Sequence, residues 1–275
     1  MSNFICVTCG VQYDDTGDSH PPRCSVCEDQ RQYVGPDGQR WTTLEQLQAS
    51  HHNEFRRHEA NLVGIGTAPA FAIGQRALLV LSPEGNVLWD CVSLLDEFTE
   101  LTVRALGGVS AIAISHPHYY SSLAEWSDTF GAPVYLHSAD REWVMRNSSS
   151  IVHWDGEQFN LHGGMTLVRS GGHFEGGTVL HVPFLAGGRG ALLTGDIIQV
   201  IPDRNFVAFM YSYPNLIPLP ARTVTRVAAA ADPFEFDRIY GAWWDRVIPT
   251  GAKAIVARSA ERYVAALQPE GLAAR

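Results

Sequence analysis

The pattern of apolar and polar positions changes twice along the chain. Residues 1–38 contain few aliphatic side chains and cannot build a hydrophobic core of their own. Residues 39–60 are polar with a few regularly spaced leucines, and Thr42 or Thr43 can cap them, a pattern that predicts a connecting helix. Across residues 61–275, short apolar runs alternate with turn residues. The chain therefore divides into a small first part, a connector and one larger α/β domain.

The larger part is expected to begin with a hairpin and to continue with alternating strands and helices. Short apolar runs predict strands over residues 77–81, 87–89, 109–114, 133–136, 166–169, 179–182, 191–193 and 238–240. Longer periodic segments predict helices over residues 94–106, 122–130, 221–231 and 251–267. This order is typical of sheets that pack between layers of helices.

Composition and charge narrow the classes of partner. The formal net charge is −9 and the chain has no basic stripe, which argues against binding to nucleic acid and favours a small-molecule substrate. No apolar run approaches the ~20 residues of a membrane helix, and the first residues lack the pattern of a signal peptide. A cytoplasmic location is therefore expected. The pattern leaves the oligomeric state open.

Four of the five cysteines form two closely spaced pairs near the start of the chain. The first pair is Cys6-Val7-Thr8-Cys9, and the second, Cys24-Ser25-Val26-Cys27, follows after fourteen residues. Each Cys-x-x-Cys turn directs two thiolates at one ion, so that two turns complete a tetrahedral site. The bound metal would also supply the folding free energy that this apolar-poor segment lacks. A redox pair of the thioredoxin kind would need a strand and helix around it and no second pair.

The identity of this first metal is left open between zinc and iron, with zinc favoured. Four thiolates bind either metal in a tetrahedral arrangement. The segment resembles the rubredoxin-like knuckle of rubrerythrins, in which Cys-Gly-x-x-Tyr and a proline-rich approach precede the second pair. Here these features are Cys9-Gly10 with Tyr13, and Pro21-Pro22. The resemblance would imply iron, but zinc ribbons share much of the pattern.

Histidines and an aspartate follow the ends of several expected strands. An apolar strand leads into Ser115-His116-Pro117-His118, and in an extended segment residues i and i+2 face the same side. His173 follows two glycines after another strand, and a further strand ends in Gly195-Asp196. Positions just beyond strand ends are where α/β sheets place their ligand sites.

The order of these motifs resembles the metallo-β-lactamase superfamily over residues 61–275. The family's hallmarks are a strand ending in His-x-His-x-Asp-His, a later histidine after glycine, a Gly-Asp and a last histidine after a C-terminal strand. Asp90 is similar to the family's early strand-ending aspartate. The resemblance implies a four-layer αβ/βα sandwich with metal in the cleft between the sheets, here preceded by the four-cysteine knuckle.

The sequence departs from the family motif where the second metal ion would bind. The position of the motif's aspartate holds Tyr120, the following histidine is replaced by Ser121, and residues 239–244 contain no histidine.

The first metal position, which the family holds with three histidines, is intact. The resemblance therefore implies one ion, zinc or alternatively iron, on His116, His118 and His173, with Asp196 as a fourth ligand or an outer anchor. A three-histidine set with one open position is also the general pattern of a catalytic zinc.

Tyr120 is the candidate catalytic residue. A phenol with an ordinary pKa of ~10 is a proton donor at neutral pH, so Tyr120 could hydrogen-bond an oxyanion but would be a poor base. The alternative is that the ring packs in the cleft wall.

The remaining histidines and Cys91 are not assigned to a metal site. His51, His52 and His58 are expected to be solvated on the connecting helix, and Cys91 to be a small buried residue. Buried histidines usually make structural hydrogen bonds, which is the interpretation for His137, His153, His162 and His181. For His137, which follows a strand, the alternative is that it reaches the cleft. The aromatic and proline-rich residues 206–220 suggest a cleft wall, with an oligomer contact or ordinary core as alternatives.

Three functions are compatible with these motifs. The first is a metal-dependent hydrolase of a small ester, thioester, lactone or amide, built on one zinc. The second is a non-catalytic member of the fold that binds metal or ligand, which the Tyr120 and Ser121 replacements favour. The third is an iron-dependent redox protein in which the knuckle transfers electrons.

Overall fold

The computed structural model describes residues 3–17 and 19–268, which form two compact units. The first unit covers residues 1–154 and the second residues 155–275. Each unit is built around one large mixed sheet.

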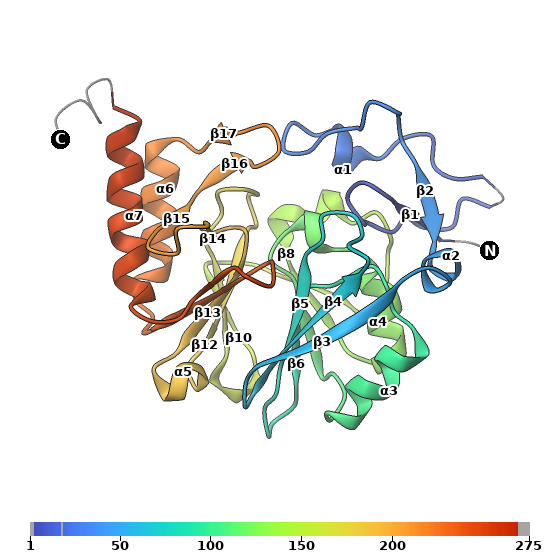
Figure 1. Cartoon of the computed structure of the whole chain (residues 1–275), viewed down its shortest axis with the longest axis horizontal. Coiled ribbons are helices and arrows are strands. Elements are labelled where there is room, and N and C mark those ends of the chain that lie inside the picture. The colour runs from blue at the N-terminus through green and yellow to red at the C-terminus, as the bar shows by residue number, and fades with distance from the viewer. Residues whose placement is uncertain (1–2, 18, 269–275) are drawn as a thin grey trace. The chain divides into compact units, whose positions relative to one another are not determined.

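The first unit contains a seven-stranded sheet in the order β3-β4-β5-β6-β7-β8-β9 and a separate two-stranded ribbon, β1-β2 (Figure 1). Its strands are β1 (Phe4–Cys6), β2 (Trp41–Thr43), β3 (His52–Glu59), β4 (Leu62–Ala68), β5 (Arg76–Val80), β6 (Val87–Trp89), β7 (Ala111–Ala113), β8 (Val134–His137) and β9 (Ile151–Trp154). Its helices are α1 (Ser25–Glu28), α2 (Leu44–Gln48), α3 (Glu97–Ala105) and α4 (Leu123–Phe130), with short 3-10 turns η1 (Pro117–Tyr119) and η2 (Ser138–Trp143).

The sheet of the first unit changes from antiparallel to parallel pairing at β6. Strands β3 to β6 pair antiparallel, and β6 to β9 pair parallel. The change follows from the connections, because parallel neighbours need a crossover, and α3 and α4 provide the first two. Since β6 and β7 run in the same direction, their carboxyl ends open at the same edge of the sheet.

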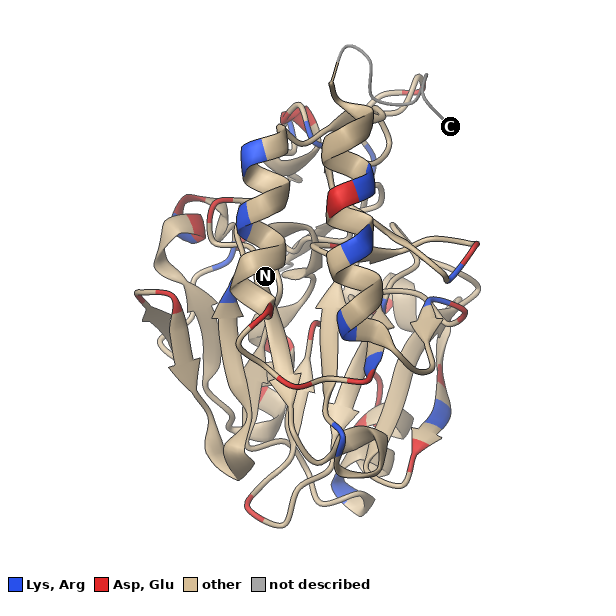
Figure 2. Ribbon diagram, turned by 90° about the vertical axis from the view of Figure 1, so that its left-hand side faces the viewer, with Lys and Arg blue, Asp and Glu red and all other residues tan. Residues whose placement is uncertain are grey.

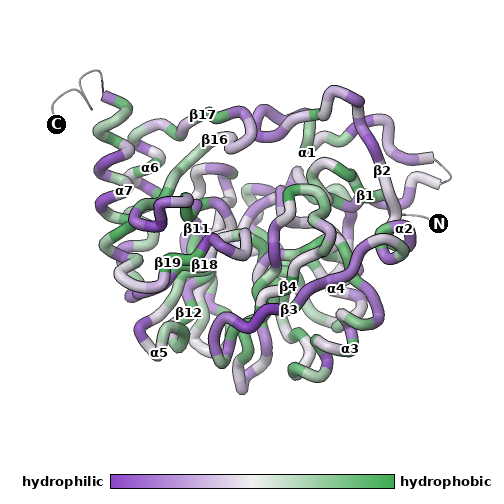
Figure 3. The backbone as a smooth tube through the Cα atoms, viewed as in Figure 1, coloured by the Kyte–Doolittle hydropathy of each residue, from purple (hydrophilic) through white to green (hydrophobic). Residues whose placement is uncertain are grey.

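The expected connecting helix over residues 39–60 is wrong for most of its length. Only Leu44–Gln48 is helical, and Thr43 caps it by accepting a hydrogen bond from the backbone N–H of Gln46. His52–Glu59 is instead the edge strand β3, paired on one side only, with β4. Edge strands commonly carry charged residues, which hides the alternation of a strand. Figure 3 shows β3 in the hydrophilic colours.

The second unit contains a six-stranded sheet in the order β10-β11-β12-β13-β18-β19 and two small hairpins. Its strands are β10 (Gln158–Asn160), β11 (Thr166–Arg169), β12 (Thr178–Val182), β13 (Ala191–Gly195), β14 (Gln199–Val200), β15 (Val207–Ala208), β16 (Met210–Ser212), β17 (Ile217–Pro218), β18 (Arg238–Gly241) and β19 (Val247–Ile248). Its helices are α5 (Leu185–Gly188), α6 (Ala221–Ala231) and α7 (Ala252–Ala266), with the 3-10 turn η3 (His162–Gly164).

Helices α6 and α7 form the helical layer of the second unit. Their inner faces supply Val224, Val227, Ile255 and Val256 to a core that also includes buried strand residues. Their charged residues are mostly basic, with one acidic residue in α7 (Figure 2). Burial of one apolar stripe per helix explains why both helices were predictable from their periodicity.

Candidate metal centres

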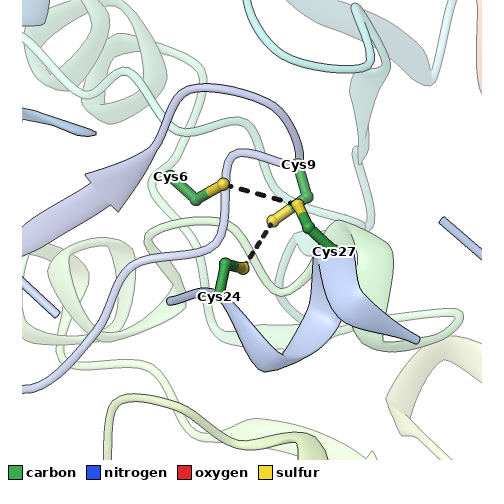
Figure 4. A group of neighbouring side chains, drawn as sticks. All are labelled: Cys6, Cys9, Cys24 and Cys27. Atoms are coloured by element: carbon green, nitrogen blue, oxygen red, sulfur yellow. Dashed lines mark hydrogen bonds between the residues drawn. The ribbon is translucent and has the colours of Figure 1, made fainter. Parts of the chain in front are cut away.

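The four cysteines of the first motif converge on one point. Cys6 ends β1 and Cys9 lies in the turn after it, while Cys24 and Cys27 lie at the start and within α1. All four side chains are buried, and their sulfurs lie within 4.8 Å of one another (Figure 4). Cys6 Sγ is 3.5 Å from Cys27 Sγ, and Cys9 Sγ is 3.6 Å from Cys24 Sγ.

These distances match the donor set of a tetrahedral metal site. Four sulfurs held about 2.3 Å from one zinc ion at tetrahedral angles lie about 3.8 Å apart. Two separations in the cluster, 3.5 and 3.6 Å, approach that value without any S–S bond. The cluster therefore fits zinc or iron and requires only a small expansion.

Burial and mutual contact give the four thiols conflicting proton affinities. Hydrogen bonds from Cys24 and Cys27 lower the pKa of Cys6 well below its usual value. Complete burial raises the pKa of Cys9 well above its usual value. A bound cation would balance the negative charge that burial opposes, because coordination deprotonates each thiol.

Two side chains outside the cysteine motif donate hydrogen bonds to the sulfurs. The Tyr13 hydroxyl lies 3.3 Å from Cys24 Sγ, and Gln39 Nε2 lies 2.9 Å from Cys6 Sγ. Burial, followed by the charge of Cys24, raises the pKa of Tyr13, so the phenol stays a donor. Tyr13 is part of the sequence pattern that resembles rubredoxin, but nothing in the sequence marks Gln39, which lies twelve residues after Cys27.

His116 and His118 lie on a tight turn beyond β7. His116 is extended, but Pro117–Tyr119 forms the 3-10 turn η1, so the expectation of a fully extended His-x-His is wrong. The two rings nevertheless lie close, with centroids 5.2 Å apart, and both side chains are buried. The proline is at the first position of the turn, where its fixed φ and missing N–H are tolerated.

A hydrogen-bonded chain from Asp90 through Ser115 fixes the His116 ring. Asp90 directly follows β6 and meets Ser115 because β6 and β7 are parallel neighbours. Asp90 Oδ1 accepts from the Ser115 backbone N–H at 2.8 Å and from the Ser115 hydroxyl at 2.7 Å. Because the Ser115 hydroxyl donates its hydrogen bond to Asp90, Ser115 Oγ is left to accept one from His116 Nδ1, at 2.9 Å. His116 therefore carries its proton on Nδ1, which leaves Nε2 as the ligand atom.

Tyr120 and Ser121 complete the turn that contains the histidines. Burial, with a smaller contribution from the negative charge of Asp140, raises the pKa of Tyr120 well above its usual value. Tyr120 lines a small cavity with Val11 and Gln12 of the cysteine-bearing segment. The phenol is thus buried and protonated at neutral pH.

His173 and Asp196 lie in the second unit, each beyond a strand. His173 follows β11 after Gly171-Gly172, both at positive φ, and a Cβ on Gly172 would lie 3.0 Å from Val227. His173 Nδ1 is 3.2 Å from the Met210 carbonyl, to which it donates, so Nε2 is the unprotonated nitrogen of the ring. Asp196 is buried just after β13, and its backbone carbonyl accepts from the Tyr213 hydroxyl at 2.7 Å.

The structure corrects the expectation that His58 is solvated on a connecting helix. His58 lies on β3, half-buried, with Nε2 2.8 Å from Arg76 Nη1, and so is not a solvated helix residue. The structural interpretations of two others are confirmed: His137 accepts from the backbone N–H of Ala139 at 3.1 Å, and His181 Nε2 lies 2.8 Å from the Glu235 carbonyl.

Cys91 is completely buried, as expected, and burial raises the pKa of its thiol. In the segment of residues 206–220, Phe209 and Leu219 belong to the core of the second unit, one of the alternatives for that segment. Across the described part of the chain, each helix is too short or too polar to cross a bilayer.

Comparisons with known proteins identify the family. The model of the Metallo-beta-lactamase superfamily matches residues 72–242. The Uncharacterized protein YmaE of Bacillus subtilis (strain 168) is 51% identical over 272 residues, 98% of either chain. The crystal structure of VMB-1 superposes with a TM-score of 0.59 at 12% identity, over 79% of this chain and 99% of that one. The structure of FIM-1 from Pseudomonas aeruginosa, in its mono-zinc form, superposes with a TM-score of 0.57 at 14% identity, over 77% of this chain and 96% of that one.

These likenesses confirm the expected fold class, a metallo-β-lactamase α/β sandwich with a four-cysteine cluster near its N-terminus. The superfamily is best known for metal-dependent hydrolases. The family model covers more than half of the chain, and the match to YmaE extends along nearly all of it. The chain belongs to the metallo-β-lactamase superfamily.

Proposed function

We propose that the chain is a metal-dependent hydrolase that uses one zinc ion on His116, His118 and His173 to cleave a small ester, thioester, lactone or amide. The observation that carries this proposal is that hydrogen bonds at Nδ1 orient two of these rings. Ser115 Oγ holds Nδ1 of His116, and the Met210 carbonyl holds Nδ1 of His173. Both Nε2 atoms are therefore in the form that binds a cation.

The donor set suits a catalytic metal. Zinc held by three histidines supplies a Lewis acid and a nucleophile at neutral pH. Asp196 is placed by the family pattern as a fourth ligand or as an anchor outside the ligands, and its side chain is buried. The mono-zinc form of FIM-1 shows that the fold accommodates a single zinc ion in that protein.

Tyr120 has a donor role in this proposal. Its raised pKa keeps the phenol protonated, so it can donate a hydrogen bond to the negative charge that develops on the substrate oxygen. Loss of that donor in Tyr120→Phe would lower kcat by about 10- to 1000-fold with little change in bound metal. Unchanged turnover would assign Tyr120 to packing against Val11 and Gln12 instead.

The first test is the metal content of freshly purified protein. We expect two metal ions per chain in the wild type and one in His116→Ala, with the knuckle metal retained. His52→Ala, which removes an exposed histidine of β3, is the matched control and should keep both ions. A wild-type protein with only one ion, lost when the cysteines are substituted, would rule out the histidine site.

A screen of ester, thioester, lactone and amide substrates then separates hydrolysis from binding. Turnover that disappears in His116→Ala supports the hydrolase. Two bound metals without turnover across the screen would favour a binding member of the family, the alternative supported by the burial of Tyr120 and Ser121.

A further inference from the structure

The cysteine-bearing segment is joined directly to the turn that carries the histidines. The knuckle loop is residues 10–14, and the histidine turn is residues 116–121. The Gln12 backbone N–H donates to the Ser121 carbonyl at 3.0 Å. The Ser93 hydroxyl donates to the Gly10 carbonyl at 2.7 Å. Gln12, Ser93 and Ser121 are all buried, so neither bond competes with bulk water.

The approach of the knuckle loop is close enough to require glycine. Gly10 has a φ of +83°, and a Cβ at this position would lie 2.7 Å from Ser93 Oγ and 3.1 Å from Ala72 Cβ. The Gln12 side chain extends the contact, because its Nε2 donates to Glu125 of α4 at 3.3 Å and its Oε1 accepts from Arg146. The knuckle loop is thus packed on the first unit and is not a separate appendage.

Ser121 is held in an uncommon conformation at the end of the histidine turn. Its φ is +47°, in the left-handed region that costs energy for residues other than glycine. Its hydroxyl donates to the Cys91 carbonyl at 3.2 Å and accepts from Gln75 Nε2 at 3.1 Å. The knuckle loop adds the bond from Gln12 to the same residue. This conformation persists because several contacts fix it together.

These contacts use the two positions at which the sequence departs from the family motif. Tyr120 and Ser121 occupy the places of the motif's aspartate and second histidine. Tyr120 instead lines a cavity with Val11 and Gln12, and Ser121 accepts the backbone bond from Gln12. At the two places where the motif would supply ligands for a second metal ion, Ser121 accepts a bond from the knuckle loop and Tyr120 borders a cavity beside it.

We propose that the knuckle, once it holds its metal, positions the histidine turn through Gln12 and Ser93 and thereby strengthens metal binding by His116 and His118. This inference rests on the proposed histidine metal site for its effect on affinity. The apolar residues of the knuckle core other than cysteine are few, so a bound metal is needed to order the knuckle loop. Gln12 and Ser93 are positioning residues in this arrangement, because they act through Ser121 and Gly10.

The test compares the double variant Gln12→Pro/Ser93→Ala with Ser127→Ala, because proline at position 12 removes the backbone N–H that donates to Ser121, whereas alanine would keep it. Ser127 is a matched control, because it is a buried serine of the same unit that donates to a backbone carbonyl, that of Ala132, at 2.7 Å. Competition with a chromophoric zinc chelator measures the affinity of each site. We expect the double variant to weaken the histidine site about 10- to 100-fold, as removal of outer-shell contacts does, and Ser127→Ala to leave it unchanged.

Hydrogen exchange gives a readout that does not depend on the histidine-site metal. The Tyr119 and Tyr120 amides donate within the histidine turn, to His116 and Pro117, so their exchange reports its opening. The double variant, and separately Cys24→Ser/Cys27→Ser, should exchange faster at these amides than the wild type and Ser127→Ala.

The two proposals fail in different ways. A wild type that binds no metal on its histidines overturns the proposed function, and faster exchange in the variants would still support the positioning role. Wild-type exchange and wild-type affinity in Gln12→Pro/Ser93→Ala would overturn the positioning role, whatever the histidines bind.

Discussion

At the scale of single residues, the histidine site depends on a hydroxyl that no motif marks. Ser115→Ala removes the acceptor of His116 Nδ1 and one donor to Asp90. Because ligand orientation by such contacts typically contributes 10- to 100-fold to metal affinity, we expect a loss of about that size at the histidine site and none at the knuckle. Zinc competition on the purified variant measures both affinities.

Ser115→Thr keeps the hydroxyl and should recover most of the affinity. Ser110→Ala is a suitable control, because Ser110 precedes the same strand, at the end opposite His116, and its hydroxyl donates to a backbone carbonyl, that of Asn86, at 2.8 Å. Equal affinities in Ser115→Ala and the wild type would show that the Asp90–Ser115–His116 chain does not orient the ligand.

His58 makes stability depend on pH. Burial, followed by the charges of Arg76 and Arg56, lowers its pKa from 6.5 to about 4. Between these two pH values the unfolded chain binds a proton at His58 that the folded chain does not bind. The favourable contribution of the neutral His58 ring to stability is therefore complete above pH 6.5 and is lost as pH falls from 6.5 toward 4. Since the ring is half-exposed, screening limits the loss to on the order of 1 kcal/mol.

The variant His58→Gln keeps an acceptor for Arg76 but cannot titrate. Urea unfolding between pH 7 and pH 4 should show a smaller loss of stability in this variant than in the wild type. His52→Gln, on the same strand but exposed, controls for the loss of an imidazole. Parallel pH profiles for wild type and His58→Gln would contradict the assignment.

The residues with fixed spacing were predictable, and those that act through space were not. The Cys-x-x-Cys pairs and their convergence follow from the geometry of two short turns. Gln39, Ser115 and Gln12 contact the two centres only after folding, and amide and hydroxyl side chains have no spacing rule that reveals their partners. Asp90 was identified by its place at a strand end, although its bond to Ser115 was not.

At the scale of elements, capping explains where α3 begins. Asp96 is its N-cap and accepts from the Thr99 backbone N–H at 2.7 Å, and Glu97 and Glu100 favour the same end. We expect Asp96→Ala to lower the free energy of unfolding by about 1 kcal/mol. Denaturant unfolding measures the change. Asp128→Ala, an exposed aspartate within α4, should change stability by less than about 0.5 kcal/mol, and an equal loss in both variants would contradict a capping role.

Elements with one buried face were predictable from the sequence, and polar or very short ones were not. Val87–Trp89, Thr166–Arg169 and Ala221–Ala231 have the expected bounds, because each is delimited by turn residues and buries apolar side chains. The strand β3 was taken for a helix because its charged residues hide the period of two. The hairpin of Met210–Ser212 and Ile217–Pro218 is too short to give a period at all.

At the scale of the whole molecule, the order of motifs predicted the family, but not what the knuckle contacts. The contacts that place the knuckle loop join Gly10 to Ser93 and Gln12 to Ser121, residues about a hundred positions apart. Pairings at such separation depend on the completed sheet and leave no local pattern. The replacements at Tyr120 and Ser121 were visible in the sequence, but the sequence did not show that Ser121 accepts a bond from the knuckle loop or that Tyr120 borders a cavity beside it.

Removal of the knuckle metal should open the knuckle while the larger sheets stay folded. The knuckle core consists of the four cysteines with Val11 and Val26, whereas each large sheet has its own apolar core. Trypsin can report the opening at Arg31, whose side chain is 14% exposed, bonded to Asp29 and stacked over Trp143. After chelation, cleavage at Arg31 should accelerate by about tenfold or more. A decrease of about 1.4 kcal/mol in the free energy of local opening raises the open population by that factor.

The internal control is cleavage within α7, at Arg258 and Arg262, which should keep its rate in the same digest. These arginines are far from the knuckle in sequence and lie on a helix whose inner face belongs to the core of the second unit. Acceleration at Arg31 alone means that the metal stabilises the knuckle locally. Equal acceleration at α7 would show instead that the chain unfolds as one cooperative unit when the metal is lost, and resistance at Arg31 would show that the knuckle folds without it.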